Sequence, residues 1–159
     1  MSKLDGNERW KSKMLLTEHQ EQYENRNKHP QTGRVTTEEL TMIRDAIMFP
    51  YMLTMCEKSL QDLRISTHLF KQIHEQFIQI IMKDISRDLS KTNRELRQRN
   101  IKIFSDETHD GIIYHRYICR GYEDRFGIVR EVLRSEISVR FTKYSMRILS
   151  QLNREEQSI

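Results

Sequence analysis

The stretch STHLFKQIHEQFIQIIMKDISRDLSKTNRELRQRN, residues 66–100, decides the fold class. Its apolar residues recur at intervals of three and four, and they keep to one helical face for about nine turns at 3.6 residues per turn. A helix of this length needs another element to cover its apolar face. We therefore predict a long amphipathic helix, beginning at Ser66, in a mainly helical protein. The apolar face holds Leu69, Ile73, Phe77, Ile80 or Ile81, Ile85, Leu89, Thr92 and Leu96.

A second amphipathic helix is predicted immediately upstream. Thr36 and Glu39 have the spacing of a capping box, in which each side chain bonds the backbone amide of the other residue. Pro50 lacks an amide hydrogen and clashes with the preceding turn, so we expect a kink or a break near Phe49. The apolar stripe of this helix is Met42, Ala46, Phe49, Leu53, Cys56, Leu60 and Leu63.

A β-hairpin is predicted downstream, at about residues 101–119. Its first strand begins with alternating isoleucines, a turn follows at Asp110 and Gly111, and IIYHRYIC at 112–119 is rich in β-branched and aromatic residues. Gly121 ends this strand, and GYEDRFG at 121–127 indicates a turn and the start of a helix. An isolated hairpin is marginal in water, so this one must pack on the helices or pair with another chain.

The last helix carries two apolar sets. One continuous stripe consists of Phe126, Val129, Leu133, Ile137, Phe141, Tyr144, Ile148 and Leu152. The second set lies on roughly the opposite side at about 100° per residue and contains Ile128, Val132, Val139 and Met146. We expect this helix to be central in the fold or to form an interface through the second set.

These elements predict a mainly α (α+β) fold. We expect a bundle of three to four helices, two of them long, with one β-hairpin between the last two helices. Residues 1–35 form a weakly docked N-terminal helix and linker, 36–153 the helical domain, and 154–159 a disordered tail. The five Gly and two Pro residues are too few for the turns of a sandwich or barrel.

The composition indicates the reducing cytoplasm. Cys56 and Cys119 lie in separate elements without a metal-type spacing, and the N-terminal residues lack the plan of a signal peptide. No apolar run approaches the roughly 20 residues of a membrane helix, so we expect no membrane partner. The net charge of +4 is mildly basic and permits an acidic partner or nucleic acid without requiring either.

No motif for catalysis, a cofactor or a metal is present in the sequence. No two histidines share a helix face with a carboxylate in the HExxH manner, and the sequence has neither a GxSxG elbow nor a glycine-rich phosphate loop. Cys56 falls on an apolar stripe, which is typical of a buried thiol. We therefore expect no metal, no cofactor and no enzymatic activity, although scattered residues such as His74, Glu75 and Cys119 can build a site without a local motif.

One basic pattern suits nucleic acid. It begins on the end of the long helix, continues in the hairpin and alternates there with tyrosines, which combines phosphate contacts with planar rings for stacking. The ordinary alternative is cations that complement a helix dipole and tyrosines that pack across strands. The cations are Arg87, Lys91, Arg94, Arg97, Lys102, Arg116 and Arg120.

Two functions follow from these patterns. The first is a non-catalytic regulatory or adaptor protein that acts through protein–protein contacts, including self-association as a homodimer. It rests on the doubly apolar last helix, the lone hairpin and the eight methionines. The alternative is a small nucleic-acid-binding regulator that uses the basic helix end and hairpin.

Overall fold

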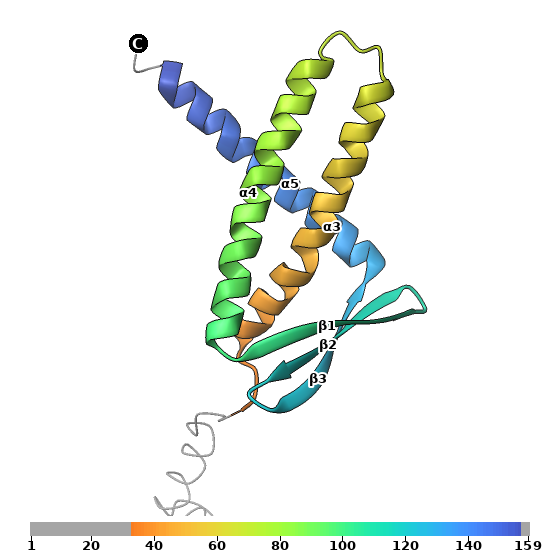
Figure 1. Ribbon diagram of the computed structural model, residues 1–159, viewed down its shortest axis with the longest axis vertical. Helices are drawn as coiled ribbons and strands as arrows, with labels where there is room; N and C mark the ends of the chain where they lie inside the picture. The colour runs from red at the N-terminus through yellow and green to blue at the C-terminus, as the bar shows by residue number, and fades with distance from the viewer. Residues whose placement is uncertain (1–32, 157–159) are drawn as a thin grey trace, which may run out of the picture. The chain divides into compact units, whose positions relative to one another are not determined.

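The computed structural model describes residues 33–156, apart from the side chains of residues 106, 155 and 156. Within this range it has three helices and one three-stranded antiparallel sheet (Figure 1). A mainly helical fold with an antiparallel sheet agrees with the predicted class. The predicted N-terminal helix and most of its linker lie outside the described residues. In chain order the elements are α3 (Thr37–Ile65), α4 (Lys71–Gln98), β1 (Ile101–His109), β2 (Ile112–Cys119), β3 (Tyr122–Val129) and α5 (Arg130–Glu156).

Helix α3 begins at the predicted capping box. The Glu39 amide donates to Thr36 Oγ1 at 3.2 Å, and the Thr36 amide donates to Glu39 Oε2 at 2.9 Å. The predicted break near Phe49 is wrong, because the helix continues through Pro50. The missing proline amide removes one helical hydrogen bond, but Phe49 and Met52 on either side of it are buried in the core. Tertiary packing therefore holds the helix together across the proline.

Helices α3 and α4 form an antiparallel hairpin that α5 crosses (Figure 1). Helix α4 begins at Lys71 rather than at the predicted Ser66, and residues 66–70 make the connection. Helix α5 runs to Glu156, three residues into the predicted disordered tail. The three helices thus meet near the middle of the hairpin, and the connection between α3 and α4 lies beyond the crossing.

The sheet has one strand more than predicted. Strand β2 pairs with β1 and also with β3, in the order β1-β2-β3. The predicted helix start within residues 121–127 is therefore wrong, because residues 122–129 form β3. Arg120 and Gly121, with φ of 48° and 90°, form the turn of a second hairpin. Two successive residues with positive φ match the twist of antiparallel strands. The third strand gives the marginal first hairpin the partner that it needs.

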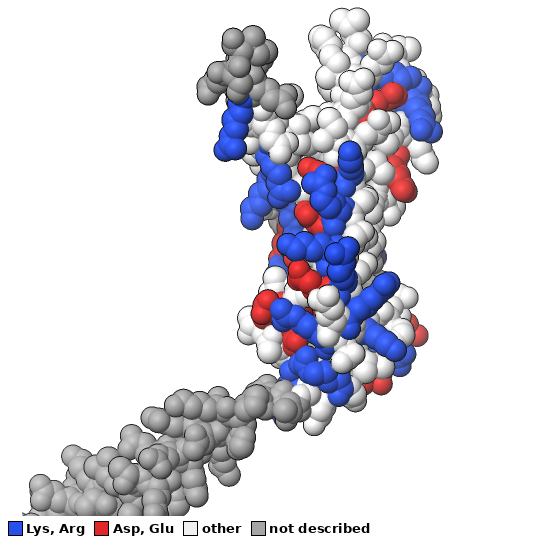
Figure 2. Space-filling view, turned by 60° about the vertical axis from the view of Figure 1, so that its left-hand side comes forward, with Lys and Arg blue, Asp and Glu red and all other residues white. Residues whose placement is uncertain are grey.

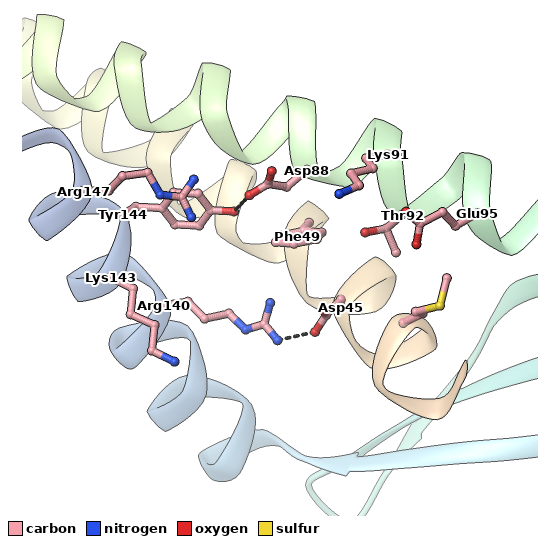
Figure 3. Close-up of a pocket in the computed structure, with 11 residues that line it drawn as sticks. Asp45, Phe49, Asp88, Lys91, Thr92, Glu95, Arg140, Lys143, Tyr144 and Arg147 are labelled. Carbon is pink, nitrogen blue, oxygen red and sulfur yellow. Dashed lines mark hydrogen bonds and ion pairs between the residues drawn. The ribbon is translucent and has the colours of Figure 1, made fainter. Parts of the chain in front are cut away.

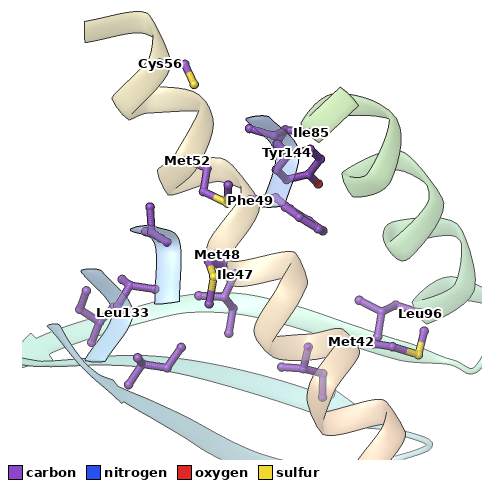
Figure 4. Close-up of a cluster of buried hydrophobic side chains, with 14 of the residues drawn as sticks. Met42, Ile47, Met48, Phe49, Met52, Cys56, Ile85, Leu96, Leu133 and Tyr144 are labelled. Carbon is purple, nitrogen blue, oxygen red and sulfur yellow. The ribbon is translucent and has the colours of Figure 1, made fainter. Parts of the chain in front are cut away.

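The core lies where the N-terminal half of α3 meets the sheet, α4 and α5 (Figure 4). Its completely enclosed side chains come from three elements and are Ile43, Met48, Met52, Ile85 and Cys119. The apolar face predicted for α4 is divided between core and solvent. Ile81, Ile85 and Leu96 are buried, but Leu69, Ile73 and Ile80 are exposed.

Candidate functional site

A groove of about 460 Å³ opens between α4 and α5, with α3 as its floor (Figure 3). Its size falls within the range of small-molecule sites in proteins. We call it the α4–α5 groove. The residues that line it are Met42, Asp45, Phe49, Asp88, Lys91, Thr92, Glu95, Arg140, Lys143, Tyr144 and Arg147.

Two of the three carboxylates in the α4–α5 groove already have partners. The Arg140 guanidinium donates to Asp45, and the Tyr144 hydroxyl donates to Asp88 Oδ2 at 2.5 Å. Burial, followed by the hydrogen bond to Asp88, raises the pKa of Tyr144 well above its ordinary value. The phenol therefore stays protonated and acts as a hydrogen-bond donor across the range of neutral pH. These contacts connect α5 to both helices of the hairpin.

Three cations in the groove have no such partner. Lys91 on α4 and Lys143 and Arg147 on α5 make no ion pair with any residue in the described range 33–156. The Arg147 guanidinium lies over the Tyr144 ring, 5.1 Å from its centroid, which orients it without neutralising it. Figure 2 shows a face of the molecule on which Lys and Arg side chains are numerous. The groove therefore has a surplus of positive charge.

The structure separates the cations predicted to bind nucleic acid. Only Lys91 lies in the groove. Arg87 pairs with Asp84 at 3.2 Å, and Arg116 on β2 pairs with Glu123 at 3.1 Å. Arg94 and Arg97 on α4 and Lys102 on β1 are exposed. Sequence reasoning missed Lys143 and Arg147, because their nearness to α4 depends on how α5 crosses the hairpin.

Arg120 is a structural residue. It holds the buried carboxylate of Glu39, which is only 3% exposed, through hydrogen bonds of 2.8 and 3.1 Å. Arg99 approaches the same carboxylate at 4.0 Å. The hydrogen bond from Arg120 is the main reason that the pKa of Glu39 falls to about 2. The first turn of α3 is thereby fixed to the β2–β3 turn and the end of α4, so Arg120 is not free to contact phosphates.

A second candidate surface lies at the far end of the α3–α4 hairpin. Here large apolar side chains face solvent, with Leu69 87% and Ile73 61% exposed. These residues lie in the second half of α3, in the connection and in the first part of α4. We call this set the distal face, and it consists of Ile65, Leu69, Phe70, Ile73 and Ile80.

Three of the four residues predicted to form an interface are exposed on the last helix. Val132, Val139 and Met146 are each at least 50% exposed on α5. The prediction is wrong for Ile128, because this residue lies in β3 rather than in the helix and is only 6% exposed. In that strand its side chain packs into the core beneath the sheet. Met146 and Met55 also line a shallow groove of about 410 Å³ between α3 and α5.

Comparison with known proteins identifies the family. Residues 34–149 match the family described as YhjD protein. This segment is most of the chain and contains α3, α4, the three strands and α5 up to residue 149. The chain belongs to the YhjD protein family. The Bacillus subtilis (strain 168) relative named Uncharacterized protein YhjD is 26% identical over 103 residues, which cover 65% of this chain and 86% of the relative. No solved structure matches the chain significantly.

The YhjD match includes both the α4–α5 groove and the distal face, so each belongs to the part of the chain that defines the family. No helix within residues 33–156 is long and apolar enough to cross a membrane. The same range contains no group of three or more His, Cys, Asp or Glu residues that would hold a metal. Burial raises the pKa of Cys56 to about 11 and also raises that of Cys119, so both thiols remain protonated at neutral pH.

Proposed function

We propose that this YhjD protein is a non-catalytic regulatory or adaptor protein that acts through protein–protein contacts, and that a second copy of the chain covers its distal face. The observation that carries the proposal is the exposure of Leu69 in the connection and of Ile73 on α4, at 87% and 61%, whereas Ile85 of the same apolar stripe is completely enclosed. Contiguous exposed apolar surface on a soluble protein marks an interaction site.

The distal face lacks the layer that the rest of the hairpin has. Near the sheet, α3 and α4 bury their apolar residues against the strands and α5. Beyond the crossing of α5, no other element of residues 33–156 covers the two helices, and Ile73 and Ile80 of α4 stay exposed. Burying a large apolar side chain stabilises a protein by roughly 1.5–3 kcal/mol. A second hairpin packed on this face would complete a four-helix bundle.

Charge favours an identical copy over an anionic partner. Residues 57–80 carry three acidic and three basic residues, so the distal hairpin is electrically balanced. A balanced surface can face its own copy without net repulsion, and interfaces between like subunits are usually symmetric. Nucleic acid and anionic membranes instead attract surfaces with an excess of Lys and Arg. The charged residues are Glu57, Lys58, Asp62, Arg64, Lys71 and Glu75.

Light scattering coupled to size exclusion tests the proposal. The full chain is expected to elute as a dimer, and Ile73→Lys with Ile80→Lys is expected to elute as a monomer, because both lysines would be desolvated in the interface. Gln72→Lys with Gln79→Lys is the matched control. Those residues are exposed, have the same spacing and lie on a different face of α4, so the control adds the same charge and is expected to remain dimeric.

Circular dichroism establishes that both variants keep their helical content. Monomeric wild-type protein at every concentration up to the solubility limit would contradict the proposal. A dimer that survives Ile73→Lys with Ile80→Lys would also contradict it, because the interface would then lie elsewhere, for example on the exposed stripe of α5. Dissociation of the control variant to the same extent would show that added charge alone is responsible.

A further inference from the structure

We propose that the α4–α5 groove binds the phosphate groups of a small anionic ligand. The groove gathers Lys91, Lys143 and Arg147 from two helices that are about fifty residues apart in sequence, and it leaves these three cations without an ion pair in the described part of the chain. This inference is independent of the dimer, because it concerns a different surface.

The charge surplus comes from how the acidic side chains are used. Arg140 satisfies Asp45, and the Tyr144 hydroxyl satisfies Asp88. Asp45 therefore cannot serve as the counterion for Lys143, and Asp88 is drawn toward the phenol rather than toward Lys91. Glu95 is the one remaining carboxylate of the lining. Three cations against one carboxylate leave the described lining with a net positive charge, which favours the binding of an anion.

The shape of the groove strengthens the attraction. Its floor includes the side chains of Phe49 and Met42, which are buried and form an apolar wall of low dielectric constant. Cations at the rim of a concave site with such a wall focus their field on the enclosed space. The same charges on a convex helix surface would be screened by solvent over a distance of about 10 Å.

The donor types suit phosphate. Arg147 presents a planar fork that can bond two oxygens at once, and its position over the Tyr144 ring fixes the plane of that fork. Lys91 and Lys143 supply point charges from opposite walls (Figure 3). Thr92 adds a hydroxyl that can donate or accept. A chain of two or three phosphates spans such a set of donors better than a single carboxylate does.

The volume favours a small ligand. A groove of about 460 Å³ has the capacity of an ordinary small-molecule site. Its two rings, Phe49 and Tyr144, are both buried, so neither offers an open face on which a nucleic-acid base would stack. We therefore expect the groove to recognise a short chain of phosphates, which free oligophosphates and nucleoside triphosphates share. The experiment below distinguishes these two classes of ligand.

Isothermal titration calorimetry of the full chain at low salt tests the site with sodium tripolyphosphate and with ATP. We expect binding at one site per chain. Equal affinities would mean that the phosphate chain alone is recognised, whereas tighter binding of ATP would mean that the nucleoside contributes. Both results support the proposal. Failure of both ligands to bind would overturn it, as would a single-stranded oligonucleotide that binds when neither small ligand does.

Paired charge removals on α5 locate the site. Lys143→Gln with Arg147→Gln removes two groove cations at a spacing of four, and we expect at least about a tenfold loss of affinity, because hydrogen bonds to charged groups are the strong ones. Arg130→Gln with Arg134→Gln removes two cations at the same spacing, outside the lining of the groove. That control is expected to bind within about twofold of the wild type. Equal losses in the two variants would overturn the assignment to the groove.

Discussion

The two halves of the α3–α4 hairpin have the same kind of sequence and very different surroundings. Both halves carry apolar residues every three or four positions. In the half near the sheet, Ile85 is completely enclosed, whereas in the distal half Ile73 of the same helix is 61% exposed. The difference shows that an amphipathic pattern specifies a face to be covered and does not specify what covers it. In the half near the sheet, the strands and α5 of the same chain cover the apolar face.

The largest expected effect contrasts these two isoleucines. Ile85→Ala is expected to lower the free energy of unfolding by about 4 kcal/mol, because it removes a buried side chain and leaves a cavity. Ile73→Ala is expected to lower it by less than about 1 kcal/mol when the protein is dilute enough to be monomeric. Urea denaturation at low protein concentration measures both values. Similar losses for the two variants would mean that the distal half is already covered within one chain.

The next effect concerns the Glu39 carboxylate, which connects α3 to Arg120 in the half of the hairpin near the sheet. The pKa of Glu39 in the folded protein, about 2, lies below its ordinary value of 4.5. The stabilisation is therefore present above about pH 4.5 and is lost as the pH falls toward 2. Glu39→Gln is expected to lower the free energy of unfolding by about 3–4 kcal/mol at neutral pH, since each pKa unit corresponds to about 1.4 kcal/mol.

Denaturation curves across the acidic range check this dependence. Wild type and Glu39→Gln are expected to differ most at neutral pH and to converge near pH 2, where the native carboxylate becomes protonated. A difference that stays constant between neutral pH and pH 2 would show that the pairing of Glu39 with Arg120 contributes no charge-dependent stability.

The smallest effect lies at the boundary between the two halves, where α5 crosses the hairpin. Tyr144→Phe removes the hydroxyl that donates to Asp88 and keeps the buried ring. We expect a loss of about 1 kcal/mol in the free energy of unfolding, which is typical of a hydrogen bond whose acceptor can reach solvent. A loss as large as that of Ile85→Ala would mean that this bond, rather than apolar packing, fixes α5 on the hairpin.

The sequence predicts the periodic elements well, because periodicity is local. The capping box at Thr36 and the long stripe of α4 are visible in the chain itself and have their expected structures. Strand β3 was missed because Glu123, Asp124 and Arg125 interrupt its apolar pattern, and of its residues only Ile128 is fully buried. Its pairing with β2 depends on the turn at Arg120 and Gly121, and positive φ at an arginine has no sequence signal.

The candidate sites depend on tertiary structure. The cations of α4 are visible in the sequence as a stripe. Lys143 and Arg147 on α5 lie in the same groove as Lys91 only because α5 crosses the hairpin beside Asp88. Likewise, the sequence places Leu69 and Ile73 on the same apolar face as Ile85, and only the position of α5 decides which of them is covered. Long-range geometry of this kind is not contained in local spacing.

Hydrogen exchange at two protein concentrations tests the central claim most directly, namely that a second copy covers the distal face. If it does, backbone amides in residues 57–80 will exchange more slowly in concentrated protein than in dilute protein, while those in residues 84–98 beside the α4–α5 groove will exchange at the same rate. Exchange in residues 57–80 that is independent of concentration would contradict the account. Slowing confined to residues 84–98 would place the interface on the groove instead.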